Sequence, residues 1–274
     1  MMGKFKKLIK ISKIIISNPK VLGCILMHDN PPDKYVKNKF KISELRTVDL
    51  LDLFPNFDTE VFPYSGASHS STPLDYALLR KFAENIPHCR YFEIGTWLGE
   101  SIANVASIAE ECVSLSLSDQ EMKKMGETQD RIQVHRFFSK DKKNIQHILG
   151  NSQKFNFDTL GKFDLIFIDG DHNIKAVEND TKNAFKLLKD ENSVIVWHDY
   201  SGLSTDLINY DVLSGILDGC NEEQRSHLYH ISNTKCAIYI RKNLKVSNEK
   251  NIFLPMKNFK IKISAIPLHG EQNN

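Results

Sequence analysis

Short apolar runs alternate with amphipathic segments through the middle of the chain, and this alternation restricts the fold more than any other feature. Runs with strand character occur at residues 91–94, 113–117, 132–138, 163–168 and 194–197. Segments with helical spacing separate them, at 100–110, 119–125, 140–149 and 174–188. Because the strands are almost continuously apolar and each is followed by a helix, we expect a parallel sheet with helices on both faces. Ligands bind such a sheet at the carboxyl ends of its strands.

The sequence on either side of this region does not show the same alternation of strands and helices. Residues 40–74 predict an irregular lead-in, in which the polar run 65–72 is either a lid or a solvated loop. After an expected helix at 203–217, strands at 226–231 and 236–241 are joined so tightly that they must be antiparallel. The tail has strand character at 259–263. We therefore divide the chain into an N-terminal segment, an α/β domain and a C-terminal extension, at residues 1–72, 73–243 and 244–274.

The N-terminal segment is strongly basic. Residues 1–46 carry eleven Lys or Arg against three Asp or Glu, a net charge of +8, so the remainder carries −6 of the total of +2. Within residues 4–18, apolar side chains share one helical face and lysines lie opposite. Such a helix lies on an anionic membrane surface, or it packs on its own domain or a partner subunit.

Cysteine usage and hydropathy bear on the compartment. The five cysteines are scattered and include no C-x-x-C pair, which argues against a disulfide framework and a zinc knuckle. No run approaches the roughly 18 apolar residues that span a bilayer, and no signal peptide is recognisable. We expect a cytoplasmic protein, peripheral at the inner membrane face if its basic helix binds there.

A glycine-containing turn follows the first strand of the α/β region. The sequence YFEIGTWLGES at residues 91–101 places Gly95 and Gly99 between a strand and a helix, where they allow a sharp turn. Nicotinamide and flavin sites use G-x-G-x-x-G instead, with a pyrophosphate at the helix N-terminus. Glu93, inside the strand, would repel a pyrophosphate but suits the ammonium and sulfonium charges of S-adenosyl-L-methionine.

These residues resemble motif I of class I S-adenosylmethionine-dependent methyltransferases. The resemblance implies an α/β, Rossmann-like, doubly wound and mostly parallel seven-stranded sheet with a C-terminal antiparallel hairpin. It implies a cofactor site that contains Glu93, Gly95, Thr96, Trp97, Gly99, Ser101 and Asp169. Sugar and small-molecule enzymes of this kind are often oligomers, so a homo-oligomer is expected by analogy.

The family also places cofactor contacts after its second and third strands. Asp119 stands where an acid holds the ribose hydroxyls, although it could equally be the N-cap of the next helix. Ser139 follows Phe137 and Phe138, near where the family lines the adenine pocket; a pair of core aromatic residues is the alternative.

Two polar clusters follow the fourth and fifth strands. The sequence FDLIFIDGDH ends at His172, and VIVWHDY contains His198 and Asp199. In a parallel sheet these side chains emerge at the same edge. So many ionisable groups in one pocket would cost several kcal/mol unless something pairs with them, which favours a functional site.

The pairing of these clusters resembles sugar O-methyltransferases of macrolide pathways, over residues 74–241. That resemblance implies Asp169 and Asp199 as ligands of Mg²⁺ and His172 as the base that removes the hydroxyl proton. His198 stands where the sugar enzymes have an acid. Because Mg²⁺ prefers oxygen ligands, a set of Asp169, His198 and Asp199 would favour Mn²⁺ or another transition metal. Without a metal, His172 oriented by Asp171 or Asp169 would act alone.

Simpler interpretations stand beside these roles. Asp171 could only cap a helix that starts near Asn173, and His198 could only bond a neighbouring loop. Asp180 is expected to be a solvated or structural acid.

The absence of three catalytic motifs argues against hydrolases, nucleotide triphosphatases and metalloproteases. A nucleophile elbow, a phosphate loop and an H-E-x-x-H helix are all missing from the sequence. We predict an O-methyltransferase for a sugar, glycan or glycosylated metabolite. The alternatives are a methyltransferase for another small molecule and a non-catalytic, cofactor-binding interaction module. Nucleic acid is not an expected partner, because the basic residues cluster outside the catalytic half.

Overall fold

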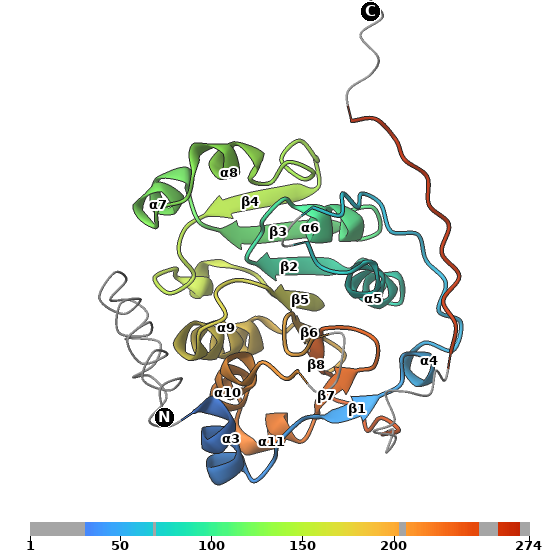
Figure 1. Ribbon diagram of the computed structural model, residues 1–274, viewed down its shortest axis with the longest axis vertical. Coiled ribbons are helices and arrows are strands. Elements are labelled where there is room, and N and C mark those ends of the chain that lie inside the picture. Colours follow the sequence, from blue (N-terminus) through green and yellow to red (C-terminus); the bar gives the residue numbers. More distant parts are fainter. Residues whose placement is uncertain (1–30, 68–69, 203–206, 247–256, 269–274) are drawn as a thin grey trace, which may run out of the picture.

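A computed structural model describes residues 31–67, 70–202, 207–246 and 257–268. Within them an eight-stranded sheet has the order β1-β7-β8-β6-β5-β2-β3-β4, and only β8 runs antiparallel to its neighbours (Figure 1). The strands are β1 (Arg46–Val48), β2 (Arg90–Ile94), β3 (Glu111–Ser116), β4 (Ile145–Leu149), β5 (Leu165–Ile168), β6 (Val194–Trp197), β7 (Leu228–Ile231) and β8 (Ala237–Tyr239). The predicted α/β, Rossmann-like architecture and its antiparallel hairpin are confirmed.

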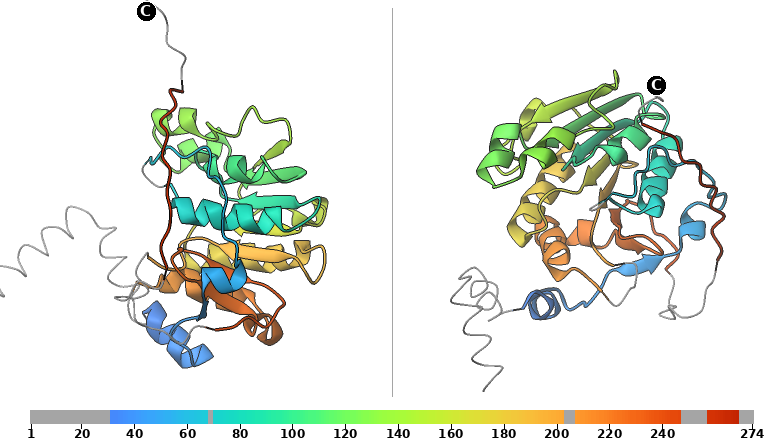
Figure 2. Two further views of the ribbon diagram at one scale, coloured as in Figure 1. Left: turned by 90° about the vertical axis from the view of Figure 1, so that its right-hand side faces the viewer. Right: turned by 45° about the horizontal axis from the view of Figure 1, so that its top comes forward.

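Helices cover both faces of the sheet (Figures 1 and 2). One face carries α3 (Pro32–Phe40), α9 (Ile174–Leu187) and α10 (Tyr210–Gly219), and the other α4 (Leu50–Leu53), α5 (Pro73–Glu84) and α6 (Glu100–Val105). The remaining short helices are α7 (Asp119–Lys124), α8 (Gln129–Val134), η2 (Phe157–Thr159) and α11 (Glu222–Arg225). Alternate residues of β5 face the two layers, since Ile166 and Ile168 pack in one core and Leu165 and Phe167 in the other.

Two adjoining elements were predicted wrongly. Residues 132–138, expected as a strand, form the end of α8 and a turn, and the third strand of the α/β region is β4, within a predicted helix. β4 lies at the edge of the sheet and is only partly buried, so its sequence IQHIL lacks the continuous apolar run of a central strand. Ile132 and Phe137 gave an apolar pattern without belonging to the sheet.

The flanks also depart from expectation. The lead-in is not irregular throughout, because it supplies α4 and also β1, which pairs with β7 and makes the sheet eight-stranded rather than seven-stranded. The helix expected at 203–217 is α10, which begins at Tyr210, and residues 203–206 lie outside the described residues. Residues 259–263 belong to no strand. The basic helix at 4–18 lies outside the described part of the chain.

None of the helices in the described ranges is long and apolar enough to cross a membrane.

Two glycines let α9 and α10 pack at close range. A Cβ added at Gly215 would lie 2.5 Å from the Cβ of Val177, and one at Gly219 would lie 2.5 Å from the Cβ of Thr181. Both distances are far below van der Waals contact. α9 begins at Ile174, shortly after Asp169 at the end of β5, so this packing holds the helix that follows the Asp169 loop.

We expect Gly215→Ala to lower the free energy of unfolding by about 1–3 kcal/mol, because the added methyl group overpacks the contact with Val177. Gly→Ala in a helix without such a contact would instead add up to about 1 kcal/mol. Urea denaturation measures the difference. Gly150→Ala is the control, since its added Cβ meets only Phe155, at 4.0 Å. Equal stability of Gly215→Ala and the parent would contradict the packing argument.

Candidate functional site

The candidate site lies at the carboxyl edge of four adjacent parallel strands, β6, β5, β2 and β3. The glycine turn follows β2, Asp119 follows β3, Asp169 follows β5, and His198 and Asp199 follow β6. The sheet therefore gathers the predicted cofactor and catalytic residues along one side. This is the edge where open α/β sheets bind ligands.

The two glycines of the turn are required by close approach within the protein. Gly95 has φ 94° and Gly99 φ 80°, a region that residues with a Cβ rarely adopt. A Cβ at Gly95 would lie 2.1 Å from the carbonyl oxygen of Asp169, and one at Gly99 2.2 Å from Oγ of Ser139. The turn thus contacts the loops after β5 and α8 directly.

Glu93 is buried beneath this turn, with no exposed surface. It accepts hydrogen bonds from the Tyr91 hydroxyl and from Oγ of Thr96, each at 2.7 Å. Burial raises the pKa of the Glu93 carboxyl to about 7, against hydrogen bonds from Tyr91, Ser101 and Thr96 that lower it. Glu93 therefore ties the turn to the sheet.

The remaining predicted cofactor residues lie around the turn. Trp97 stacks on His135 and lies under the guanidinium of Arg131, 4.5 Å from the ring centroid. Asp119 is the first residue of α7 and not its N-cap, which is Ser118. Ser139 is buried against Gly99 in the loop after α8 and does not follow a strand.

Because β4 was predicted as part of a helix, the residues that follow it were not recognised as part of the site edge. Gly150, Asn151 and Ser152 stand at the carboxyl end of β4, on the same edge as the glycine turn. The next residue, Gln153, donates to Oδ1 of Asp180 at 3.3 Å. Asp180 is 1% exposed, so it is a buried acid and not a solvated one. A strand prediction that allowed for a partly polar edge strand would have found this segment.

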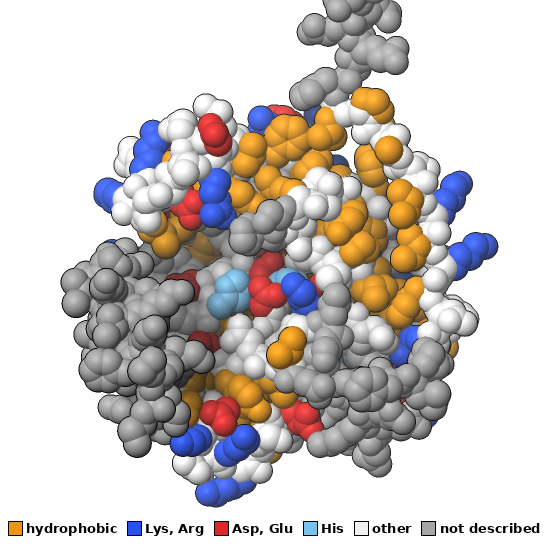
Figure 3. All heavy atoms as spheres, in the orientation of Figure 1, with side chains coloured by type: hydrophobic (Ala, Val, Ile, Leu, Met, Phe, Trp, Pro, Cys, Tyr) orange, Lys and Arg blue, Asp and Glu red, His pale blue; other side chains and the backbone are white. Residues whose placement is uncertain are grey.

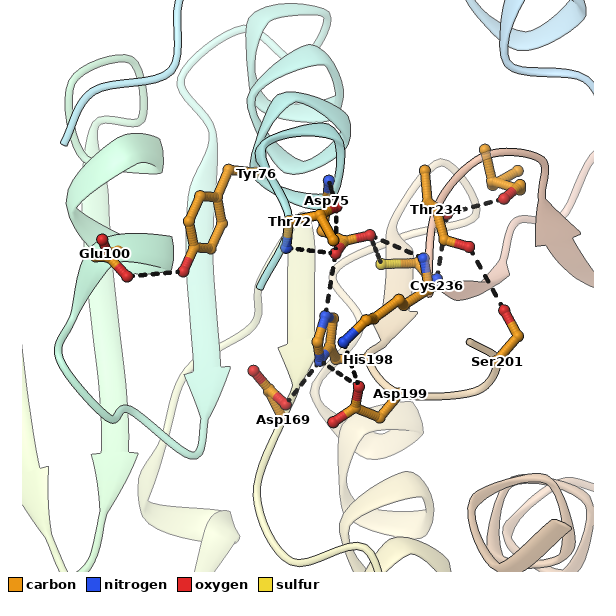
Figure 4. A network of polar contacts seen from close by, with 12 residues as sticks. Thr72, Asp75, Tyr76, Glu100, Asp169, His198, Asp199, Ser201, Thr234 and Cys236 are labelled. Carbon is orange, nitrogen blue, oxygen red and sulfur yellow. Dashed lines mark hydrogen bonds and ion pairs between the residues drawn. The ribbon is translucent and has the colours of Figure 1, made fainter. Parts of the chain in front are cut away.

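The run 65–72 is attached to the helix that follows the glycine turn. The buried carboxylate of Glu100 accepts hydrogen bonds from the Ser65 amide at 2.5 Å, the Ser70 hydroxyl at 2.6 Å and the Tyr76 hydroxyl at 3.2 Å. Figure 4 shows the Tyr76 contact. The described residues of this run are therefore not a free solvated loop.

His172 lies between two carboxylates. Its Nε2 is 3.1 Å from Oδ2 of Asp199 and 3.7 Å from Oδ1 of Asp169. Its side chain is 44% exposed, so a molecule bound at this edge of the sheet could reach it. On the face drawn in Figure 3, histidine, acidic and basic side chains lie together near the centre. Asp171 is exposed and accepts a hydrogen bond from the Asn173 amide at 3.0 Å, while Asn173 is the N-cap of α9.

His198 is buried behind this pair. Its Nδ1 is 3.2 Å from Oδ1 of Asp169 and 3.3 Å from Oδ1 of Asp199 (Figure 4). Its Nε2 is 3.2 Å from Oδ2 of Asp75, a buried residue of α5. Asp75 could not be recognised from the sequence, because nothing in its local pattern sets it apart from an ordinary acid in the first turn of a helix.

The close charges change the acidity of the cluster. The carboxylates of Asp169 and Asp199, which accept hydrogen bonds from the ring, raise the pKa of His172 to about 10. Burial lowers the pKa of His198, but its three carboxylate neighbours outweigh burial and hold that pKa well above the usual value. Burial likewise opposes ionisation of Asp169 and Asp199, yet the histidines keep both carboxyl pKa values low.

The donor set fits a divalent cation. Asp169, His172 and Asp199 offer ligand atoms that lie within 4.8 Å of one another. In the contact network three carboxylates, those of Asp75, Asp169 and Asp199, face the Lys235 ammonium and two imidazoles. Lys235 balances one of the three negative charges. The other two are balanced if both imidazoles are protonated, or if the imidazoles are neutral and a divalent cation is bound. Mixed oxygen and nitrogen donors favour Mn²⁺ or another transition metal over Mg²⁺.

We expect the Hε1 resonance of His172 in metal-free protein to titrate far above pH 6.5, near its raised pKa of about 10. Asp199→Asn removes one of the two carboxylates and should lower this pKa. Because the folded-state pKa is raised, the ion pairs add stability that is complete below pH 6.5 and is lost as pH rises towards 10. An NMR pH titration measures the shift. A midpoint near 6.5 in the parent protein would contradict the arrangement.

Comparison with known proteins agrees with this location. Residues 92–200 match a family model described as a methyltransferase domain. No curated protein matches the sequence.

Several solved structures are similar to parts of this chain at low sequence identity. A cofactor-bound protein from MTB, Rv0187, is 19% identical, with a TM-score of 0.47 over 65% of this chain and 84% of that one. An O-methyltransferase from Bacillus cereus in complex with SAH is 16% identical, with a TM-score of 0.44 over 75% and 94%. The O-methyltransferase TomG from Streptomyces achromogenes is 14% identical, with a TM-score of 0.42 over 63% and 82%. The segment that matches the methyltransferase model contains both the glycine turn and the Asp169 cluster.

Proposed function

We propose that this protein is an S-adenosyl-L-methionine-dependent O-methyltransferase that methylates a hydroxyl group of a sugar, glycan or glycosylated metabolite. One observation carries the proposal. The glycine turn and the Asp169, His172 and Asp199 cluster meet at one strand edge, within the segment that matches a methyltransferase model. The sugar class of acceptor comes from the resemblance of the two polar clusters.

In the proposed reaction the methyl group passes in line from the cofactor sulfonium to the acceptor oxygen. The carbon–sulfur bond breaks as the carbon–oxygen bond forms, the sulfonium becomes a neutral sulfide, and the hydroxyl proton passes to the His172 imidazole. His172 must be neutral to accept it, while the adjoining carboxylates favour its protonated form. Asp199 and Asp169 orient the ring.

Asp169 and Asp199 would hold a divalent cation, with His198 as a further candidate ligand. His172 would stay outside the ligand set, because a nitrogen bound to the cation could not accept the hydroxyl proton. When bound, the cation would polarise the acceptor hydroxyl and offset the negative charge that keeps His172 protonated. Asp171 contributes to the turn that presents His172. The basic residues 4–18 would bring the enzyme to acceptors at the inner membrane face.

We expect Asp119→Ala to weaken binding of S-adenosylhomocysteine by roughly 10–100-fold, because it removes a charged acceptor of hydrogen bonds from the ribose hydroxyls. Isothermal titration calorimetry measures the affinity. Asp130→Ala is the matched control, since Asp130 is an acid in the first turn of a similarly short helix, α8. No binding to the parent protein would refute the methyltransferase proposal. Equal losses in both variants would instead refute the role of Asp119.

We expect the metal-free protein to bind Mn²⁺ at pH 7 with release of about two protons per ion, one from each imidazole. Calorimetry in two buffers with different ionisation enthalpies measures the release. Asp169→Asn should abolish binding, whereas Asp164→Asn, at the opposite end of β5, should not. Binding without proton release would show that the imidazoles are not charged in the metal-free site.

The acceptor class is tested by transfer of a labelled methyl group to a panel of sugars, glycosides and catechol-like phenols, with and without Mn²⁺. Transfer to sugars or glycosides supports the full proposal. Transfer to phenols alone keeps the reaction and replaces the acceptor. S-adenosylhomocysteine binding without transfer to any acceptor class would favour a non-catalytic binding module.

A further inference from the structure

Asp75 occupies an unusual position for an acid in the first turn of a helix. It has no exposed surface, although it belongs to a capping box at the start of α5. Its Oδ2 accepts hydrogen bonds from the amide and the hydroxyl of Thr72, at 2.8 and 2.7 Å. The Thr72 amide bond and the reciprocal bond from the Asp75 amide to Oγ1 of Thr72, at 3.2 Å, complete the capping box, which requires no further partner.

The same carboxylate reaches two other parts of the fold. Its Oδ1 accepts a hydrogen bond from the Lys235 amide at 2.9 Å and lies 3.6 Å from Sγ of Cys236, in the turn between β7 and β8. Its Oδ2 is 3.2 Å from Nε2 of His198, which follows β6. A buried carboxylate is strongly destabilising unless a cation or several donors face it. Here the basic side chain that faces it, among the described residues, is His198.

His198 has its two ring nitrogens in opposite directions. With Nε2 directed at Asp75, Nδ1 is directed at Asp169 and Asp199 (Figure 4). The ring cannot turn without losing contacts on both sides. Lys235 connects the same groups again, because its backbone bonds Asp75 and its ammonium lies 3.5 Å from Asp199.

We propose that Asp75 is a positioning residue for the candidate catalytic cluster: it anchors His198 through Nε2, and His198 in turn fixes the carboxylates of Asp169 and Asp199. The N-terminus of α5 thereby sets the geometry in which His172 is held. The consequence for catalysis rests on the proposed function, whereas the anchoring itself does not.

The experiment records the ring nitrogens of His198 by long-range ¹H–¹⁵N NMR of the metal-free, full-length protein, with His198→Asn to assign the signals. In the parent protein we expect Nε2 to carry a proton, held by Asp75. Asp75→Asn, which preserves shape, should shift both ring nitrogens, and Asp75→Leu should shift them further. Asp164→Asn is the control, because Asp164 is also a buried acid but accepts from the Arg90 amide and Lys189.

A second readout is Mn²⁺ affinity, which we expect to fall about 10–100-fold in Asp75→Asn, as for other residues that orient metal ligands, and to be unchanged in Asp164→Asn. S-adenosylhomocysteine affinity should fall less than Mn²⁺ affinity in Asp75→Asn, because Asp75 reaches the proposed cofactor residue Asp169 only through His198, and it should be unchanged in Asp164→Asn. Unshifted His198 signals in Asp75→Asn would overturn the inference, and so would an unprotonated Nε2 in the parent protein. The parent spectrum decides even if a variant fails to fold. Failure of the parent protein to bind S-adenosylhomocysteine would refute the proposed function while leaving the NMR result to decide the anchoring.

Discussion

The burial of His198 among three carboxylates is the interaction on which the candidate site depends. Asp75, Asp169 and Asp199 come from α5, the end of β5 and the end of β6, and without a cation between them they would repel one another. Buried charges persist only when they are paired and hydrogen-bonded. The imidazole therefore joins elements that the sheet topology merely brings near one another.

The glycine turn couples this cluster to the cofactor side of the site. Gly95 lies so close to the backbone of Asp169 that no side chain fits between them, and Glu93 holds the turn from below through Thr96. A displacement of the loop after β5 would therefore be felt at the turn. In a methyl transfer this coupling would keep the donor carbon and the acceptor oxygen in register, which is where oriented binding lowers a barrier most.

The sequence predicted the central strands and the edge at which the polar groups meet. Buried parallel strands are continuously apolar, and here they are followed by a glycine turn or by a cluster of acids and histidines. β6 was predicted to the residue, and β2 and β5 nearly so. Edge strands were lost for the opposite reason. β4 and β1 are partly exposed and mixed in composition, so their pairing is decided by tertiary contacts that a local pattern does not carry.

The same limit explains Asp75. It is 123 residues from His198 in the chain, and its local sequence predicts only a helix cap. The sequence did show, by contrast, that His198 stands where the sugar enzymes have an acid. The contact between His198 and Asp75 gives a physical reason for a histidine at this position. A histidine in place of an acid exchanges a negative charge for a cationic one, and in this chain the buried carboxylate of Asp75 faces that cation. If the proposed divalent ion binds, it takes the place of two protons in this cluster, so the net charge of the contact network is the same with and without the ion.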